Sequence, residues 1–347
     1  MSGTLLALAW RLPLILLTLA GGGWGALALH FRGPDNGFVR GLLIALWLLA
    51  ALASIAAFIL PRAPALVWLG PGVFALAILA FAGWWHGIQP RHDRDWAPDV
   101  ARLLDARIDG DTVTLHNVRN FDWRSRSDFD AHWETRRYDL STLRSADLIV
   151  SYWMGPAIAH TLVSFGFEDG RHLVFSVEVR RTRGQEFSAL GGFFRQSELV
   201  LVAADERDIV RTRSNVRGEQ VYIYPVAMPP AELRSLFAAY ADEARQLQHE
   251  PRFYNTLLSN CTTIVYDMVK RIVPGLPWDH RLLLSGYLPD YIYDLGALDT
   301  RRPLAELKRR GHINDRAIAS DVDGQASPAF STAIREGVPT PPAHTAD

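Results

Sequence analysis

The first 90 residues alternate long apolar stretches with short polar breaks, and the remainder of the chain does not. Three stretches of 20 or 21 residues contain no Asp, Glu, Lys or Arg: Leu12–Phe31, Gly41–Leu60 and Ala65–Trp85. A helix rises about 1.5 Å per residue, so roughly 20 apolar residues cross a hydrocarbon core about 30 Å thick. Inside lipid the backbone must satisfy its own hydrogen bonds, which favours helices. The pattern therefore predicts three transmembrane helices, over about 12–31, 41–60 and 65–85.

The breaks between the stretches fit this interpretation. The second and third stretches are separated only by Pro61–Pro64, and so short a link predicts an antiparallel helical hairpin. Trp84, Trp85 and His86 end the third stretch as an aromatic interface belt does. A buried bundle in a soluble protein and a cleaved signal peptide are the alternatives, but three such stretches in succession argue against both.

After a polar juxtamembrane linker at Arg91–Pro98, apolar residues follow a period of two, which is typical of strands with one buried face. Strands are predicted over Thr112–Val118, Asp147–Trp153, His160–Phe167, His172–Val179, Leu199–Ala203 and Gln220–Val226. The acidic-glycine turn Glu168–Gly170 joins two of them into a hairpin. Ahead of the strands, Val100–Ile108 is predicted to be a short helix.

Apolar residues at helical spacing follow the strands in two places. Pro230–Gln248 starts with proline, and Cys261–Ile272 is stopped by a Pro-Gly pair. Strands grouped in the middle with helices beside them predict one α+β domain over residues 91–312. The remaining residues, 313–347, are predicted to be a tail whose end, from Gly337 on, is disordered.

Composition excludes several classes of protein. The formal net charge of −1 gives no sign of a nucleic-acid partner, and a single cysteine cannot form an internal disulfide. Neither a zinc-ligand spacing, nor a phosphate-binding glycine loop, nor a G-x-S-x-G elbow is present. Asp321–Gly324 resembles a calcium loop, but its glycine comes too early and no closing Glu follows. We therefore expect neither a metal nor a cofactor.

One strongly charged stretch, Asp205–Arg217 (DERDIVRTRSNVR), stands out in the water-facing part. Its alternating acids and arginines are most simply a solvated or salt-bridged surface. A place near lipid headgroups is the other interpretation, because arginine binds phosphate well.

The segment around the lone cysteine is the best candidate for chemistry. Ser259 and Asn260 are good N-cap residues, which places Cys261 at or within the first turn of a helix. Free N–H groups and the positive end of the helix dipole lie there, and both favour thiolate over thiol. The same N–H groups can hold an oxyanion, with Tyr254 and Asn260 in support. The alternative is a small buried residue at a helix start, since free cysteine is often buried.

A thiolate nucleophile needs a base, which is usually histidine. Four histidines lie in the regular part of the domain: His160, His172, His249 and His280. We favour His160, because it begins an apolar strand where a polar side chain can reach a cleft. Glu178, on the strand paired with it, is the candidate for a third residue that orients the imidazole; an ion pair with Arg180 or Arg181 is its simpler role.

Several motifs together resemble the Lnb N-terminal periplasmic domain family over roughly residues 95–295. They are Val118-Arg119-Asn120-Phe121, Tyr152-Trp153, Ala159-His160-Thr161, Ser164-Phe165, Ser176-Val177-Glu178-Val179-Arg180 and Asn260-Cys261-Thr262-Thr263. The proteins that name this family are lipoprotein intramolecular transacylases, which move an acyl chain onto an N-terminal cysteine amine. The family is similar to circularly permuted relatives of NlpC/P60 and papain-like enzymes, and lecithin retinol acyltransferase has a similar Asn-Cys pair.

The resemblance implies a permuted NlpC/P60-like domain with an antiparallel sheet and a cysteine-bearing helix. It also implies that Cys261 is the nucleophile and His160 the base, in the same chain order as in the permuted relatives. Glu178 matches the Ser-x-Glu-x-Arg strand of the family. A multi-pass protein of the inner membrane with a periplasmic domain follows from the same resemblance.

The arginines near the spans point weakly the other way. With a cytoplasmic N-terminus, Arg11 and Arg62 lie inside, whereas four arginines near the spans lie outside: Arg32, Arg40, Arg91 and Arg94. That distribution runs against the positive-inside rule. We follow the resemblance, because four arginines near acidic neighbours are thin evidence.

Together these features predict a membrane-anchored acyltransferase or hydrolase that acts through a thioester on an envelope lipid or lipoprotein. Its expected partners are the bilayer and a lipoprotein or phospholipid substrate. Two alternatives remain: a peptidoglycan-type cysteine peptidase or amidase, and a non-enzymatic envelope scaffold. The walls of the cleft and the approach of Cys261 to His160 distinguish them.

Overall fold

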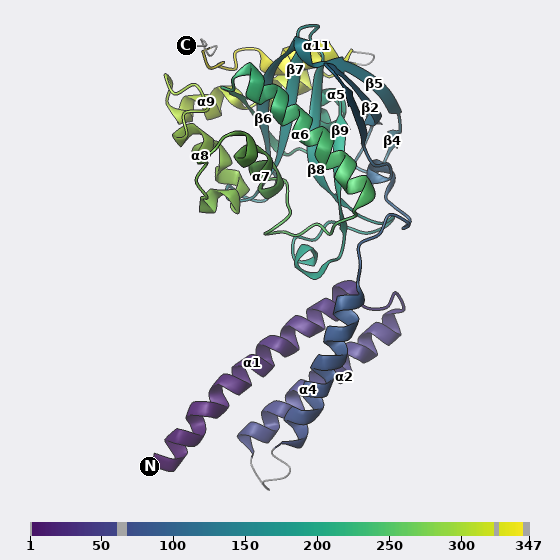
Figure 1. Cartoon of the computed structure of the whole chain (residues 1–347), viewed down its shortest axis with the longest axis vertical. Helices are drawn as coiled ribbons and strands as arrows, with labels where there is room; N and C mark the ends of the chain where they lie inside the picture. The colour runs from purple at the N-terminus through teal and green to yellow at the C-terminus, as the bar shows by residue number, and fades with distance from the viewer. Residues whose placement is uncertain (1, 61–67, 323–325, 343–347) are drawn as a thin grey trace. The chain divides into compact units, whose positions relative to one another are not determined.

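The chain forms two compact units. The computed structural model describes residues 2–60, 68–322 and 326–342. The membrane unit comprises Met1–Arg91 and Ser188–Gln196, and the sheet unit comprises His92–Phe187 and Ser197–Asp347. Figure 1 labels the elements of each unit.

Three long apolar helices make up most of the membrane unit: α1 (Ser2–Arg32), α2 (Gly37–Ile59) and α4 (Leu69–Gly87). Segments of 23, 23 and 19 residues within them are long and apolar enough to cross a membrane. The three predicted spans are thus confirmed by length and composition. The link Pro61–Pro64 and the first residues of the third predicted span lie outside the described residues.

Glycines allow α1 and α2 to approach closely. A Cβ atom on Gly25 would lie 2.3 Å from the ring of Trp47 on α2, and Trp47 Nε1 donates to the Gly22 carbonyl at 2.9 Å. Helices in lipid associate mainly through such close packing at small residues. The Trp47 ring also lies 5.2 Å from that of Phe74 on α4, so this tryptophan contacts both of the other helices.

The membrane unit also includes a segment from the loop between two strands of the sheet unit. Within Ser188–Gln196, a 3₁₀ turn at Gly191–Phe194 places Phe194 against α1, where its ring stacks on Phe31 at 5.5 Å. Arg195 follows and donates to the Trp85 carbonyl at 2.9 Å. The chain therefore joins the two units both at Arg91 and through this loop.

The sheet unit is built on one eight-stranded sheet. Its strands are β1 (Asp105–Asp109), β2 (Thr112–Arg119), β5 (Trp133–Asp139), β6 (Leu143–Tyr152), β7 (Ala159–Phe167), β8 (His172–Arg180), β9 (Glu198–Ala204) and β10 (Gln220–Val226). The order is β1-β2-β9-β8-β7-β6-β10, with β5 beside β2, and β3 (Asp122–Trp123) and β4 (Phe129–Asp130) form a separate pair. All six predicted strands are present. Neighbours are antiparallel except β2 and β9, which meet in parallel at one residue pair.

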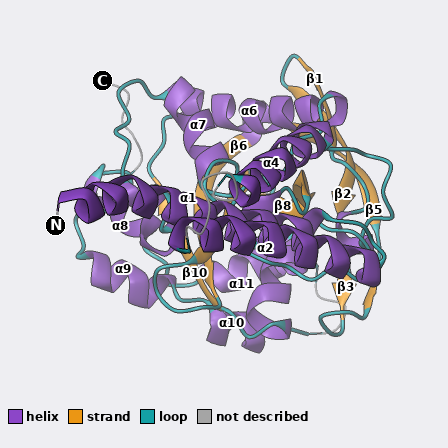
Figure 2. Ribbon diagram, turned by 90° about the horizontal axis from the view of Figure 1, so that it is seen from below, coloured by secondary structure: helices purple, strands orange, loops and turns teal. Residues whose placement is uncertain are grey.

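Helices cover both faces of this sheet (Figures 1 and 2). They are α5 (Glu206–Arg211), α6 (Pro230–His249), α7 (Thr263–Ile272), α8 (Leu288–Asp294), α9 (Leu304–Gly311), α10 (Asn314–Ala319) and α11 (Ser327–Arg335). Alternate residues of β7 and β8 supply two cores, as the period of two predicts. Phe165 and Phe175 pack with α6 and α7, whereas Leu162 and Val174 pack with α5, α10 and α11. The α+β prediction is confirmed.

One prediction about the start of the sheet unit is corrected. The helix predicted over Val100–Ile108 is absent: a 3₁₀ turn ends at Val100, and Asp105–Asp109 forms β1 because it pairs with β2 through a tight turn at Gly110, whose φ is +59°. In the predicted tail, two helices that were not predicted precede Gly337: α10 and α11. Within it, α11 buries Phe330 completely.

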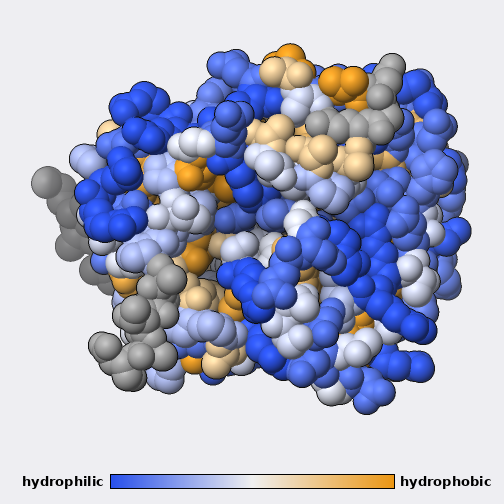
Figure 3. Space-filling model, turned by 90° about the horizontal axis from the view of Figure 1, so that it is seen from above, coloured by the Kyte–Doolittle hydropathy of each residue, from blue (hydrophilic) through white to orange (hydrophobic). Residues whose placement is uncertain are grey.

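One face of the sheet unit is mainly hydrophilic, as expected of a surface in contact with water (Figure 3). In the face that Figure 3 shows, hydrophilic residues dominate and hydrophobic ones appear only as scattered spots. Scattered apolar residues are normal on soluble proteins.

Candidate active site

The site lies where two paired strands, β7 and β8, separate. Their ladder ends at the pair Leu162 and Ser176, although both strands continue beyond it. The backbone of β7 is therefore not paired with β8 at Thr161. Cys261 occupies this place: the Thr161 hydroxyl donates to the Cys261 carbonyl at 3.1 Å, and the Thr161 amide bonds to the thiol.

Cys261 lies in the turn immediately before a helix rather than within one. The helix α7 begins at Thr263, two residues later than predicted. Asn260 holds the turn, because its side-chain oxygen accepts from the backbone amides of Thr262 and Thr263, each at 2.9 Å. Its amide nitrogen donates to the Thr256 carbonyl at 2.7 Å. The capping prediction for Asn260 thus holds, and the cap fixes the position of the thiol.

His160, near the start of β7, reaches the thiol and two polar groups of β8. Its Nε2 lies 2.8 Å from Ser176 Oγ and 3.2 Å from Glu178 Oε1. The Ser176 hydroxyl donates to the same Glu178 oxygen at 2.8 Å, so it is free to accept from Nε2–H. His160 also forms a side-chain hydrogen bond with Cys261. The three residues predicted for catalysis therefore lie together.

The charges of the site favour a thiolate–imidazolium pair. Burial alone would raise the pKa of the Cys261 thiol, but the charge of His160 and hydrogen bonds from His160 and Thr161 lower that pKa to about 7. For His160, burial and the nearby Arg213 lower the pKa, whereas Glu178 and Cys261 outweigh them and raise it to about 9. Burial would raise the pKa of Glu178, but His160 and Arg213 hold it well below its usual range. Such shifts are typical of reactive cysteines.

Glu178 does not form the ion pair that its neighbours in sequence suggested. Arg180 donates to the backbone carbonyls of residues 100 and 101, and Arg181 pairs with Asp99. The partner of Glu178 is instead Arg213, at 2.8 Å. Its carboxylate thus lies between an imidazole and a guanidinium.

The charged stretch Asp205–Arg217 is not the exposed surface that its composition suggested. Several of its members are buried: Asp205, Glu206, Asp208, Thr212, Arg213 and Ser214. It folds as α5 followed by a π-helix over Thr212–Val216, behind the sheet. Its buried acids pair with arginines from other parts of the chain, which single-sequence patterns do not reveal: Asp205 with Arg136, Glu206 with Arg335 and Asp208 with Arg119. Arg213 and Ser176 are the members of the site that sequence reasoning missed.

Tyr254 lies close enough to the site for its phenol to be affected by the charges of Cys261 and Glu178. Burial, and then the charges of Cys261 and Glu178, raise the pKa of its phenol, so the hydroxyl stays protonated. A protonated phenol is a hydrogen-bond donor, as an oxyanion requires. The side-chain donor of Asn260 is already used to hold the turn.

The other candidate histidines are engaged elsewhere. His172 approaches the Gly170 carbonyl at 3.2 Å, within the β7–β8 turn. His280 is 72% exposed beside Asp279, and His249 ends α6. Of the four histidines, His160 is the one that lies against Cys261, and its role as the base stays a prediction.

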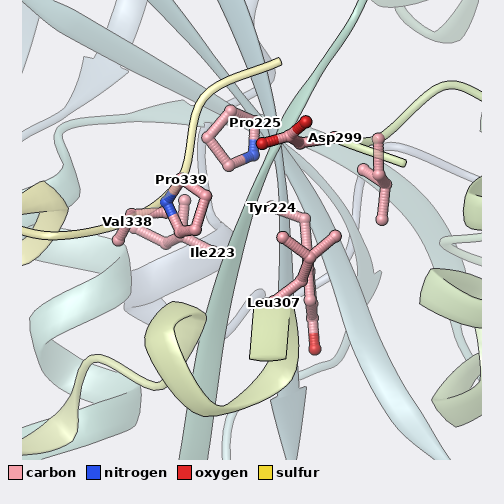
Figure 4. A pocket seen from close by; sticks show the side chains of 8 residues that line it. Ile223, Tyr224, Pro225, Asp299, Leu307, Val338 and Pro339 are labelled. Carbon is pink, nitrogen blue, oxygen red and sulfur yellow. The ribbon is translucent and has the colours of Figure 1, made fainter. Parts of the chain in front are cut away.

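A small cavity elsewhere in the sheet unit is not a substrate site. Its volume is about 10 Å³, and it lies between β10, α9 and the residues after α11 (Figure 4). Lining residues are Ile223, Tyr224, Pro225, Leu298, Asp299, Leu307, Val338 and Pro339. A space of this size holds about one water molecule.

The chain was compared with models of known protein families. Residues 129–286 match the Lnb N-terminal periplasmic domain. That range contains His160, Glu178, Arg213 and Cys261. No curated protein and no solved structure matches the chain.

Proposed function

We propose that this membrane protein, whose residues 129–286 form an Lnb N-terminal periplasmic domain, is a thiol-dependent acyltransferase or hydrolase of the cell envelope. The observation that carries the proposal is the contact of Cys261 with His160, which is itself held by Ser176 and Glu178. A nucleophile, a base and a group that orients the base are the parts that acyl transfer requires.

The reaction follows from these positions. Cys261 Sγ attacks the carbonyl carbon of an ester or amide, and the carbonyl electrons move to oxygen. When they return, the bond to the leaving alcohol or amine breaks, and the His160 imidazolium gives that group its proton. An amine or water then attacks the thioester, with neutral His160 accepting its proton, and the thiolate is released.

Hydrogen-bond donors near Cys261 are proposed to stabilise the oxyanion. The amides of Thr262 and Thr263 are already bound by the Asn260 side chain, so the backbone amide of Cys261, near the positive end of the α7 dipole, is the first donor we propose. The protonated hydroxyl of Tyr254 is the second donor we propose. Removal of one such donor typically costs about 10²–10³ in rate.

The three spans favour a lipid or lipoprotein substrate in the inner membrane. An anchored enzyme meets bilayer components at high effective concentration, because tethering makes the encounter nearly intramolecular. Among these components, the acyl ester of a diacylglyceryl group carries the carbonyl that the thiolate needs. The bilayer is thus the proposed source of the acyl chain.

Trapping the thioester tests this function. The full-length protein in nanodiscs is incubated with a phospholipid or a diacylated lipopeptide, and the peptide containing Cys261 is analysed by mass spectrometry. An acyl mass that hydroxylamine removes, and that His160→Ala lacks, is expected. Acylation by neither lipid, but cleavage of muropeptides, would favour a wall peptidase; no reaction with either class would favour a scaffold.

A further inference from the structure

Arg213 is buried against the carboxylate that orients His160. Its Nη2 lies 2.8 Å from Glu178 Oε1, and its side chain is 7% exposed. Its Nη1 lies 3.4 Å from Glu219, which accepts a hydrogen bond from Ser151 Oγ at 2.5 Å. A chain of polar contacts therefore runs from β6 to the imidazole.

The element that carries Arg213 is unusual. Thr212–Val216 is a π-helix directly after α5. Segments of π-helix are rare and occur often at functional sites, because the wider turn redirects side chains. Here the wider turn coincides with the residue that reaches Glu178.

One oxygen of Glu178 serves three donors. Oε1 receives the Ser176 hydroxyl, lies 3.2 Å from His160 Nε2 and is bonded by Arg213. A carboxylate shared between two cations holds each less tightly than it would hold one alone. Its orientation is also fixed from both sides, which limits the positions of the imidazole.

We propose that Arg213 is a positioning residue: it fixes Glu178 against His160 and keeps that carboxylate from binding the imidazolium too tightly. The inference rests on the proposed function, because a general acid must release its proton to the leaving group. Glu219 also binds Arg213 and so weakens the hold of Arg213 on Glu178. Through this contact Glu219 is expected to strengthen the binding of the imidazolium by Glu178. The pKa contributions agree, with Arg213 lowering and Glu178 raising that of His160.

The charged and titratable groups around the His160 imidazole come from several elements. They are Glu178 on β8, Arg213 and Arg217 on or after the π-helix, Glu219 before β10, Arg119 on β2, and Cys261 with Tyr254 on the far side. Among the largest contributions, Glu178 and Cys261 raise the pKa of His160 and Arg213 lowers it, so a change at Arg213 is expected to move that pKa.

The test uses the single cysteine, because any alkylation reports Cys261 and needs no substrate. Rates of modification by iodoacetamide are measured against pH in the full-length protein. Two transitions are expected, the lower from the thiol and the upper from the imidazolium. Arg213→Met is expected to raise the upper transition by about one pH unit, and Glu219→Gln to lower it.

Matched variants separate positioning from general stability. Arg213→Lys keeps the charge and is expected to leave the upper transition near its wild-type value. Arg211 ends α5, directly before the π-helix, and forms a salt bridge with Asp321. Arg211→Met removes that salt bridge and is expected to move neither transition. An unchanged upper transition in both Arg213→Met and Glu219→Gln would overturn the proposal. Failure of acyl transfer with shifted transitions would instead contradict only the proposed function.

A second inference concerns the segment Ser188–Gln196 of the membrane unit. Phe194 lies between aromatic rings of α1, 5.5 Å from Phe31 and 6.0 Å from Trp24. Arg195 lies over the Trp85 ring of α4 at 4.7 Å. Aromatic residues near span ends mark the bilayer interface. Leu190 and Phe193 of the same segment are nevertheless 48% and 40% exposed.

We infer that Leu190 and Phe193 enter the interfacial layer of the bilayer. The occupant is lipid, because the segment packs on helices that lipid must surround. Exposed apolar side chains in that layer gain from burial, whereas in water they would be a cost.

Depth-dependent quenching tests this contact. Phe193→Cys and Ser127→Cys, each in a Cys261→Ser background, are labelled with an environment-sensitive fluorophore in nanodiscs. Ser127, which is exposed on the sheet unit, is the control. Quenching of residue 193 by spin-labelled lipid, with little quenching by iodide, is expected. Iodide quenching equal to that at residue 127 would overturn the inference.

Discussion

At the residue scale, the reactivity of Cys261 arises from competition between burial and nearby charge. Burial favours the neutral thiol, and His160 with the Thr161 hydrogen bonds favours the thiolate. The charge and hydrogen bonds outweigh burial, so the pKa of the Cys261 thiol is lowered. The sequence pointed to Cys261 through capping, and the resemblance to the Lnb family pointed to both Cys261 and His160. The capping argument attributed the lowered pKa to a helix that begins only after Cys261.

The first prediction concerns the pH dependence of this thiol. Because the pKa of Cys261 is lowered from 9.0 to about 7, thiolate is present above that pH and is lost as the pH falls below it. Alkylation should therefore rise with a midpoint near pH 7. In His160→Gln the midpoint should move above 9, since burial remains and the cation is gone. A wild-type midpoint near 9 would contradict the assigned electrostatics.

Asn260 gives a second prediction at this scale. Asn260→Ala removes the acceptor for two backbone amides and should lower the free energy of unfolding by about 1 kcal/mol, with slower alkylation of Cys261. Asn260→Asp keeps the acceptor and should preserve most of the stability. Chemical denaturation measures both. Equal stability of the two variants would argue that the cap is unimportant.

At the scale of elements, the strands could be predicted because burial alternates along them. The prediction of a helix over Val100–Ile108 was wrong, because pairing of Asp105–Asp109 with β2 outweighs the local helical preference of this short segment. Arg213 and Ser176 could not be assigned roles, since their contacts depend on the register of β8 and on a π-helix that no sequence period marks. The C-terminal helices were missed for a similar reason: their order comes from contacts with the sheet.

Those contacts include a buried ion cluster. Arg335, at the end of α11, binds Asp147 at 2.6 Å and Glu206 at 2.5 Å. Arg335→Met leaves two buried carboxylates without their cation and should lower the free energy of unfolding by about 3–5 kcal/mol. Arg310→Met, which removes an exposed pair with Glu306, should cost about 0.5 kcal/mol or less. Equal losses in denaturation would contradict a structural role for the cluster.

At the scale of the whole molecule, the three candidate spans in the described residues and the match to a periplasmic domain predict the orientation of the chain. We expect a cytoplasmic N-terminus and a periplasmic link between α1 and α2. Alkaline phosphatase fused at the C-terminus or after Asp35 should be active, and a fusion after Pro64 should be inactive. The arginine distribution predicts the reverse, so activity only after Pro64 would place the sheet unit in the cytoplasm.

The central claim is that His160 activates Cys261 as a nucleophile. The most direct measurement is labelling of the full-length protein in membranes with an acyl-type activity probe, comparing wild type with His160→Ala and Cys261→Ala. We predict strong labelling of the wild type and loss of labelling in both variants, with folding verified by denaturation. Labelling that persists in folded His160→Ala, or is absent from the wild type, would contradict the claim.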